Sequence, residues 1–255
     1  MAAKPGKLYV GTSGWSYGHW ADGVFYPKGL KQADWLKYYA ERFGTVEVNM
    51  TFYRMPKPEM PTRWRKLTPP RFVFAIKLWR RVTHEKRLKT CEDALKRFFE
   101  IVAPLGPKRG PLLVQLPPTL RRNVDLLDSF LSGLKQSADQ LRWRVAVEFR
   151  NREWLCQEVY HVLDRHRAAL CLADLGSCPI AEPNHAPFLY VRRHGPAGPY
   201  WGCYTPEDIA RDAARIRGWL GEGRDVFVYY NNDVEGYAVA NARQLAEAIG
   251  AANPV

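Results

Sequence analysis

Eight short apolar runs, separated by stretches with helical periodicity, constrain the fold of this chain more than any other feature. Each run has the length of one buried strand, and most are apolar almost throughout, as parallel strands are when both faces are covered. Strict alternation of strands and helices predicts a parallel sheet, because parallel strands need a crossover connection. The predicted strands are Leu8–Thr12, Thr45–Met50, Phe72–Leu78, Pro111–Leu116, Arg144–Phe149, Ala168–Ala173, Phe188–Arg193 and Asp225–Tyr230.

The stretches between the runs carry apolar residues at helical spacing and, in one case, a clear start signal. Thr205 and Pro206 form a hydroxyl N-cap followed by proline at the first helical position. Ile209, Ala213 and Ile216 then make one apolar face. This segment is therefore predicted to be a helix that packs against the sheet.

Strand–helix units without a domain-sized break predict a single (β/α)8 TIM barrel over residues 1–255, with an N-terminal extension at 1–7 and a C-terminal tail at 250–255. The connection 175–187 is the weakest unit, because it has little helical signal. An open doubly wound sheet is the alternative, and it would carry a glycine-rich phosphate turn after its first strand. Gly11–Gly14 imitates that turn only in part.

Composition indicates where the protein works and what it binds. No apolar run approaches the roughly 20 residues that span a bilayer, and no apolar signal region is found near Met1. The five cysteines are scattered and form no C-x-x-C pair, which disfavours a zinc ribbon or a disulfide framework. We therefore expect a cytoplasmic protein with no membrane association and no obligate protein partner. The formal charge of +12 favours an anionic substrate such as DNA, RNA or a phosphorylated metabolite, unless it only reflects a basic composition.

Polar side chains occur at or just past the end of every predicted strand. Residues two apart in a strand share a face, and each polar residue is in phase with smaller or apolar residues before it. The middle layers of a barrel interior are apolar, so packing alone does not explain such a set. Active sites of this fold lie at the same end of the barrel. The set comprises Ser13, Trp15, Glu47, Asn49, Lys77, Gln115, Glu148, Arg150, Asp174, Arg192, His194, Asn231 and Asp233.

Five of these residues are predicted to be catalytic: Glu47, Lys77, Glu148, Asp174 and His194. The carboxylates can act as general acid or base. Lys77 can act as an electrostatic clamp or, with a depressed pKa, as a Schiff-base amine. His194 can donate a proton to a leaving oxygen. Glu148 and Asp174 are the candidate ligands for one Mg²⁺ or Mn²⁺, whereas a multinuclear zinc site is not expected from a single histidine at a strand end.

Substrate binding is predicted for the other residues of this set and for three loop residues. Arginine can grip phosphate or carboxylate oxygens with a forked pair of hydrogen bonds. The loops after the seventh and eighth strands often bind phosphate in this fold. Aromatic loop residues either stack on bases and sugars or pack to cap the barrel. The predicted binding residues are Ser13, Trp15, Asn49, Tyr53, His84, Gln115, Arg150, Arg192, Asn231, Asn232 and Asp233.

Motifs around these residues, in the same order, resemble the YecE-like family, described as domain of unknown function seventy-two. They include Gly11-Thr12-Ser13-Gly14-Trp15, Thr45-Val46-Glu47-Val48-Asn49, Phe74-Ala75-Ile76-Lys77, Gln115-Leu116-Pro117-Pro118, Val147-Glu148-Phe149-Arg150, His194-Gly195 and Tyr229-Tyr230-Asn231-Asn232-Asp233. The match extends from about Tyr9 to Leu245, with Tyr230 where the family is expected to have Phe. The resemblance implies a TIM barrel and leaves the reaction open. The resemblance also implies a structural relation to endonuclease-IV-like barrels, but this sequence lacks the many histidines of those trinuclear zinc enzymes.

Three functions are compatible with these features. The first is an enzyme acting on a phosphate-containing substrate, with nucleic-acid binding or phosphodiester hydrolysis as the best interpretation. Arg150, Arg192 and Lys77 would hold the anion in that case. The second is an isomerase, lyase or hydrolase for a sugar or other small phosphorylated metabolite in a closed pocket. The third is a non-catalytic nucleic-acid-binding barrel, in which loss of Glu148 or Asp174 leaves binding intact.

Overall fold

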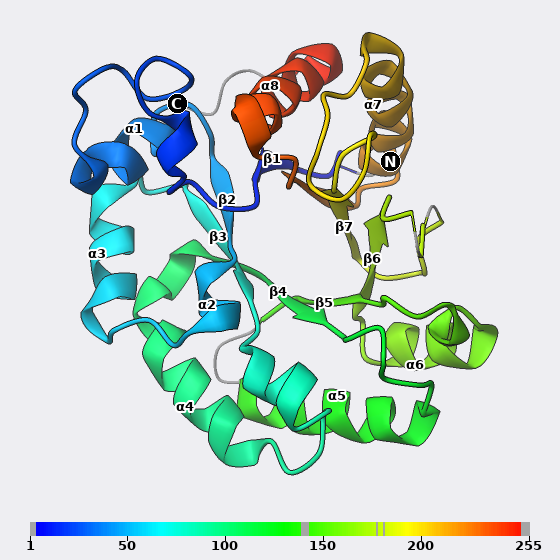
Figure 1. Ribbon diagram of the computed structural model, residues 1–255. Coiled ribbons are helices and arrows are strands. Elements are labelled where there is room, and N and C mark those ends of the chain that lie inside the picture. The colour runs from blue at the N-terminus through cyan, green and yellow to red at the C-terminus, as the bar shows by residue number, and fades with distance from the viewer. Residues whose placement is uncertain (1–3, 139–142, 177, 181, 251–255) are drawn as a thin grey trace.

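The strands form one parallel sheet that is nearly closed into a barrel, which confirms the predicted TIM-barrel class. The computed structural model describes residues 4–138, 143–176, 178–180 and 182–250. The outer parts of the predicted extension and tail, 1–3 and 251–255, lie outside the described residues. Neighbours in the sheet follow the order β1-β8-β7-β6-β5-β4-β3-β2, and Figure 1 shows the helices arranged around the strands. The strands are β1 (Leu8–Thr12), β2 (Thr45–Val48), β3 (Val73–Lys77), β4 (Arg109–Gln115), β5 (Val145–Glu148), β6 (Ala169–Ala173), β7 (Phe188–Arg193) and β8 (Asp225–Tyr230).

Helices cover the outside of the sheet at every connection except one. They are α1 (Trp35–Ala40), α2 (Met50–Tyr53), α3 (Glu59–Leu67), α4 (Glu92–Val102), α5 (Val124–Ala138), α6 (Gln157–Arg165), α7 (Pro206–Gly221) and α8 (Tyr237–Ile249). The predicted start of α7 is confirmed, since Thr205 and Asp208 form a reciprocal capping box. Between β6 and β7 the described residues contain no helix, which agrees with the weak helical signal of that connection in the sequence. Asn184 instead attaches this segment to the start of β6, because its side chain accepts from Leu170 N and donates to Ala168 O, each at 2.8 Å.

The two edge strands, β1 and β2, approach each other too closely for a side chain. A Cβ on Gly11 would lie 2.3 Å from the carbonyl oxygen of Thr45, so only glycine fits here. The Tyr39 hydroxyl of α1 accepts from Thr12 N at 3.0 Å and donates to Thr45 O at 3.1 Å. A glycine and one tyrosine hydroxyl thus join the two edges of the sheet.

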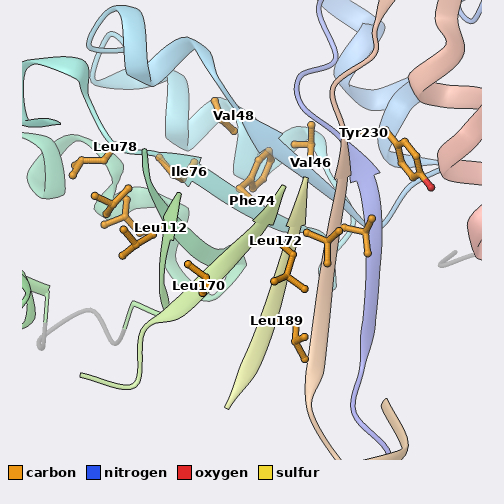
Figure 2. Close-up of a cluster of buried hydrophobic side chains, with 14 of the residues drawn as sticks. Val46, Val48, Phe74, Ile76, Leu78, Leu112, Leu170, Leu172, Leu189 and Tyr230 are labelled. Atoms are coloured by element: carbon orange, nitrogen blue, oxygen red, sulfur yellow. The ribbon is translucent and has the colours of Figure 1, made fainter. Parts of the chain in front are cut away.

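The alternation of side chains along each strand divides the core into two parts. Residues of one phase face the helices, and Figure 2 shows several of them, such as Ile76 from β3 and Leu172 from β6. Residues of the other phase fill the barrel interior. There the small side chains Ala75, Ala146 and Ala169 leave room for the large rings of β7 and β8, which satisfies the dense packing of a protein interior.

Four of the predicted strands, β2 to β5, end one or two residues earlier than expected. The run at Thr45–Met50 stops at Val48, because α2 begins at Met50, and β3 ends at Lys77. Lys77 and the carboxylate-bearing ends of β2 and β5 therefore occupy the last interior layer of the barrel.

Within the described ranges, no helix combines the length and apolar character that crossing a bilayer requires.

Candidate functional site

A buried arginine lies between two buried glutamates in the last interior layer of the barrel. Arg192 of β7 donates from Nη2 to Glu47 Oε1 of β2 at 2.9 Å and from Nη1 to Glu148 Oε2 of β5 at 2.6 Å. All three side chains are at most 1 % exposed. Burial alone would raise the pKa of Glu148, but the charges of Arg192 and Arg150 outweigh it and hold that pKa well below its usual range.

Tyr190 supports the same glutamate pair and was not predicted from the sequence. Its hydroxyl donates to Glu47 Oε2 at 2.6 Å, and burial with the nearby Glu47 charge raises its pKa well above the ordinary value. Tyr190 stands two residues before Arg192, so the same period-2 argument that selected Arg192 also places this tyrosine in the barrel interior.

His194 is held as a neutral imidazole that accepts at Nε2. The Nε2 atom lies 3.1 Å from Arg192 Nη1 and 3.1 Å from Arg150 Nη2, and guanidinium groups can only donate. The proton is therefore on Nδ1, which lies 3.5 Å from Asp174 Oδ1. Burial lowers the pKa of His194 and outweighs the opposite effect of Asp174. The predicted proton donation by His194 is not supported by this arrangement, because Nε2 carries no proton.

Asp174 orients the end of β7 through both carboxylate oxygens. Oδ1 accepts the backbone N–H of His194 at 2.7 Å, and Oδ2 accepts the hydroxyl of Tyr204. Burial would raise the pKa of Asp174, but the hydrogen bonds from His194 and Tyr204 and the charge of Arg193 lower it overall. Tyr204 was missed at the sequence level because it lies in a long loop with no periodic signal.

Lys77 lies in the same layer but makes no hydrogen bond or ion pair with any described residue. Its Nζ lies 4.3 Å from the centroid of the Phe52 ring, and the residue is 6 % exposed. Burial, with Arg192 adding to it, lowers the pKa of Lys77 to about 7. A substantial fraction of Lys77 is therefore an uncharged amine at neutral pH.

Two other predicted residues stand beside Lys77, on the rim. The edge of His84 packs on Phe52 with ring centroids 4.9 Å apart, and its Nδ1 lies 2.8 Å from Thr83 Oγ1. Burial and the nearby Lys77 lower the pKa of His84 to about 4, so it is neutral at physiological pH. Gln115 is half-buried at the end of β4. Both residues lie at the border of this layer, and their role in substrate binding stays a prediction.

The ends of β1 and β2 present polar atoms without a partner in the described protein. Ser13 Oγ and Asn49 Oδ1 are buried and unpaired, while Asn49 Nδ2 donates to Ser13 O at 3.1 Å. Buried polar atoms are normally satisfied, so this pair is suited to contact a ligand. Trp15 is half-buried and packs edge-on against Trp64 at 5.7 Å, which makes it part of the mouth's packing.

The residues that follow β8 have structural contacts rather than an open face. Asn232 is completely buried and donates to Gly202 O and Asn241 Oδ1 at 2.8 and 2.9 Å. The carbonyl of Asp233 accepts from the rings of His19 and Trp20 at 2.8 and 2.7 Å. The structure therefore does not bring Asn232 to the site, because its amide turns toward α8. Asn231 is buried at the strand end, and its backbone N–H donates to Arg193 O.

A depression of about 520 Å³ opens beside Arg150, Asp174 and His194 and is bounded by residues 195–200. The predicted anion-binding backbone of this loop is largely occupied. Gly195 N donates to the Tyr204 hydroxyl at 2.7 Å, and the N–H groups of Ala197 and Tyr200 bond to carbonyls within the loop. The side chain of Arg150, rather than the glycine backbone, therefore supplies the positive charge of this depression.

A second depression, of about 470 Å³, lies at the opposite end of the barrel. Two of its charged groups are paired, since Arg144 bonds to Asp225 at 2.7 Å and His166 to Asp128 at 2.6 Å. The convergent and partly unpaired polar groups of the molecule are at the mouth formed by the C-terminal strand ends.

Glu148 and Asp174 do not form a joint oxygen cage for a cation. Guanidinium groups occupy Glu148, and a phenol and a backbone N–H occupy Asp174. Among the residues that the structure describes, no group of three or more His, Cys, Asp and Glu is placed to hold a metal ion. The side chains present do not fit the Mg²⁺ or Mn²⁺ site considered from the sequence.

Basic residues are concentrated on one half of the barrel mouth. The connections 49–58, 78–91, 116–123 and 149–156, which follow β2 to β5, contain eleven Lys or Arg and two Glu. The residues that follow β1, β6, β7 and β8 contain two Lys and six Asp or Glu before the next helix or strand. We call the first half the basic arc. The large exposed hydrophobic residues of the described chain also lie at this mouth: Val24, Tyr53, Tyr200 and Trp201.

Comparisons with known proteins agree with the resemblance seen in the motifs. The model of a family described as "Protein of unknown function DUF72" matches residues 9–255. UPF0759 protein YecE of Escherichia coli is 30 % identical over 204 residues, which cover 78 % of this chain and 70 % of that protein. A solved DUF72 family protein from Thermotoga maritima is 27 % identical with a TM-score of 0.79 and covers 96 % of this chain and 99 % of its own.

The fold is shared more widely. A sugar phosphate isomerase/epimerase from Parabacteroides distasonis has a TM-score of 0.53 at 13 % identity, with 99 % of this chain and 96 % of that chain covered. At this identity the likeness concerns the barrel alone.

Proposed function

The chain belongs to the DUF72 family of proteins of unknown function, and we propose that it is an enzyme that binds a nucleic-acid strand along the basic arc and acts on it at the Lys77 layer. The observation that carries the proposal is the charge asymmetry of the mouth. The connections after β2 to β5 contain eleven basic residues and only two acidic ones. A charge that merely reflected composition would be distributed over all eight connections. Phosphate neutralisation by Lys and Arg supplies much of the affinity of nucleic-acid binding.

Exposed side chains along the arc suit a single strand. Arg54, Arg81 and Arg121 are exposed, and none has an ion-pair partner among the described residues. Tyr53 is 67 % exposed on α2 and offers a ring on which a base can stack, irrespective of sequence. Five free cysteines suit the reducing cytoplasm that we propose as the location.

The acid–base route considered from the sequence has less support than an amine route. Each carboxylate in the layer is engaged by a cation or a hydroxyl, and His194 accepts at Nε2. Lys77 is the basic side chain of this layer whose amine no described residue engages. Phosphodiester hydrolysis in this site would therefore use Lys77, rather than Glu148 or Asp174, as the base.

The salt dependence of oligonucleotide binding tests the proposal. Fluorescence anisotropy of a labelled single-stranded oligonucleotide would be measured between about 50 and 200 mM salt. The triple variant Arg54→Gln, Arg81→Gln, Arg121→Gln is expected to bind more weakly, with a log–log salt slope reduced by about 2, since each contact to a single strand contributes about 0.7.

A control variant removes the same charge from the outer helices. Lys37 of α1 and Lys96 and Arg97 of α4 are exposed, and their replacement by Gln should leave the slope within experimental error. Equal effects of the two triple variants, or no binding by the wild type at low salt, would overturn the proposed function.

A second candidate is an enzyme for a small phosphorylated metabolite. The depression of about 520 Å³ beside Arg150 and His194 favours it, because that volume is within the range of small-molecule sites. Calorimetric binding of ribose 5-phosphate by a protein that binds no oligonucleotide would select this function instead.

A further inference from the structure

Two buried lysines of this protein differ in what their amines contact. Lys108, which directly precedes β4, donates to Arg65 O and Thr68 O at the C-terminal end of α3, each at 2.6 Å, and to Thr68 Oγ1 at 2.9 Å. It satisfies carbonyls that the helix end leaves without partners. Lys77 has no such contact in the described protein, although it is equally buried at 6 % exposure. The amine of Lys77 therefore has no structural task that accounts for its burial.

The charges around Lys77 balance without it. Two guanidinium groups, Arg150 and Arg192, face two carboxylates, Glu47 and Glu148, in the same layer. A protonated Lys77 would add an uncompensated charge to this layer, where the residue is only 6 % exposed and its Nζ lies 4.3 Å from the centroid of the Phe52 ring. The layer therefore favours the uncharged amine more strongly than water does, and a substantial fraction of Lys77 is uncharged at neutral pH.

An uncharged, unpaired and oriented amine is a nucleophile rather than an anion clamp. A clamp must stay cationic, and Arg150 already provides a permanent cation at the entrance, where it lines the depression. A neutral amine attacks carbonyl carbon, and lysines in desolvated pockets do so in Schiff-base enzymes. Phe52 limits the directions from which a partner can approach Nζ.

We propose that Lys77 forms an imine with an aldehyde or ketone carried by a phosphate-bearing substrate, whose phosphate is held by Arg150 and the basic arc. This inference rests on the proposed function for the phosphate part of the substrate. In a nucleic-acid strand the matching carbonyl is the aldehyde of an abasic deoxyribose. In a free metabolite it is the carbonyl of a sugar phosphate.

The step consumes the amine, the carbonyl compound and one proton from solvent, and it releases one water. The Nζ lone pair forms a bond to the carbonyl carbon, and the C=O π electrons move to oxygen. A proton passes from nitrogen to that oxygen to give a carbinolamine, and a second proton allows the oxygen to leave as water. The product is an iminium whose positive charge takes the place of the ammonium, and the C–H bond beside it becomes more acidic.

Reductive trapping on the native protein tests the inference. The probes are an oligonucleotide with one abasic site, the same oligonucleotide with a tetrahydrofuran site that has no carbonyl, and ribose 5-phosphate. Each is incubated with the protein and sodium cyanoborohydride, which delivers hydride to the imine carbon and leaves a stable secondary amine. Peptide mapping by mass spectrometry then locates the adduct, with Lys108 as the buried internal reference.

The expected result is an adduct on Lys77 that exceeds labelling of every other lysine at least about tenfold, with none from the tetrahydrofuran probe. Adduct with the abasic strand, or with ribose 5-phosphate alone, supports the inference and identifies the source of the carbonyl. Labelling spread over surface lysines, or unchanged in Lys77→Arg, overturns it. The mapping is done on the wild type, so a folding defect of the variant would not weaken it.

The two proposals can fail separately. If the tetrahydrofuran strand binds with the expected salt slope but neither carbonyl probe labels Lys77, the imine inference fails and the proposed function stands. If no oligonucleotide binds but ribose 5-phosphate labels Lys77, nucleic acid is excluded as substrate and the imine inference stands.

Discussion

Replacing Arg192 with methionine tests whether one guanidinium holds the last interior layer together. Arg192 is 1 % exposed and bonds to Glu47 and Glu148 at 2.9 and 2.6 Å. In Arg192→Met the two carboxylates stay buried, and only Arg150 is left to pair with Glu148. Removing one partner of a buried ion pair costs about 3–5 kcal/mol, so we expect a loss of this size in the free energy of unfolding at pH 7.

The pH dependence of this loss has a definite sign. In the wild type the pKa of Glu148 lies below its ordinary value of 4.5, so its stabilisation is complete above pH 4.5 and is lost only as pH falls through the depressed pKa. In Arg192→Met, burial dominates and raises the pKa of Glu148. Its stabilisation is then complete below the ordinary pKa and is lost as pH rises, by about 1.4 kcal/mol at pH 7 for each pKa unit.

Urea unfolding at pH 5, 6 and 7, followed by tryptophan fluorescence, measures both effects. Arg192→Met should gain stability from pH 7 to pH 5, while Glu148 contributes no slope over that interval in the wild type. Adding Glu47→Gln removes the carboxylate that Arg192→Met leaves without a cationic partner and should recover roughly half of the loss. A loss under about 1 kcal/mol at pH 7, or parallel pH profiles for wild type and variant, would refute the assignment of Arg192 as a buried bridge.

The close contact between β1 and β2 at Gly11 and the protonation state of His194 give two further predictions. Gly11→Ala should destabilise the protein by more than about 3 kcal/mol, because its Cβ would lie 2.3 Å from Thr45 O. The control Gly133→Ala in α5 meets nothing within 4 Å and should stabilise the protein by about 0.5–1 kcal/mol. Similar melting temperatures of the two variants would contradict the close contact between β1 and β2. In NMR titrations His194 should titrate below the ordinary pKa of 6.5. Asp174→Asn should lower the pKa of His194 further, since Asp174 raises it. A midpoint at or above the ordinary pKa would contradict the neutral tautomer.

The barrel and its polar layer could be predicted because both depend on strand periodicity. Once a run is read as a parallel strand, the phase of its residues decides that Glu47, Lys77, Glu148 and Arg192 meet in one layer. The loops have no such rule. The inward turn of Asn232 depends on the backbone after β8 and on contacts with a helix that begins later in the chain, and neither is encoded in a local pattern.

The pairing of charges could not be predicted for a different reason. Several interior partners are available to each carboxylate, and the sequence does not say which oxygen a guanidinium will occupy. Residue types alone suggested a metal site at Glu148 and Asp174, whereas the structure commits both groups to protein donors. The same geometry explains why Lys77 is left over: the two arginines already match the two glutamates.

The separation between the basic arc and Lys77 follows from electrostatics. A phosphate placed directly against Lys77 would favour its ammonium form, since a nearby anion raises the pKa of a lysine, and the nucleophile would be lost. Arg150 and the exposed arginines stay charged whatever binds, so they can hold a phosphate without changing their own state. A site that must bind an anion and keep an amine uncharged therefore needs the two functions on different residues, and the amine buried behind the cations. The barrel meets both conditions, with exposed arginines on the rim and Lys77 buried in the last interior layer, against Phe52.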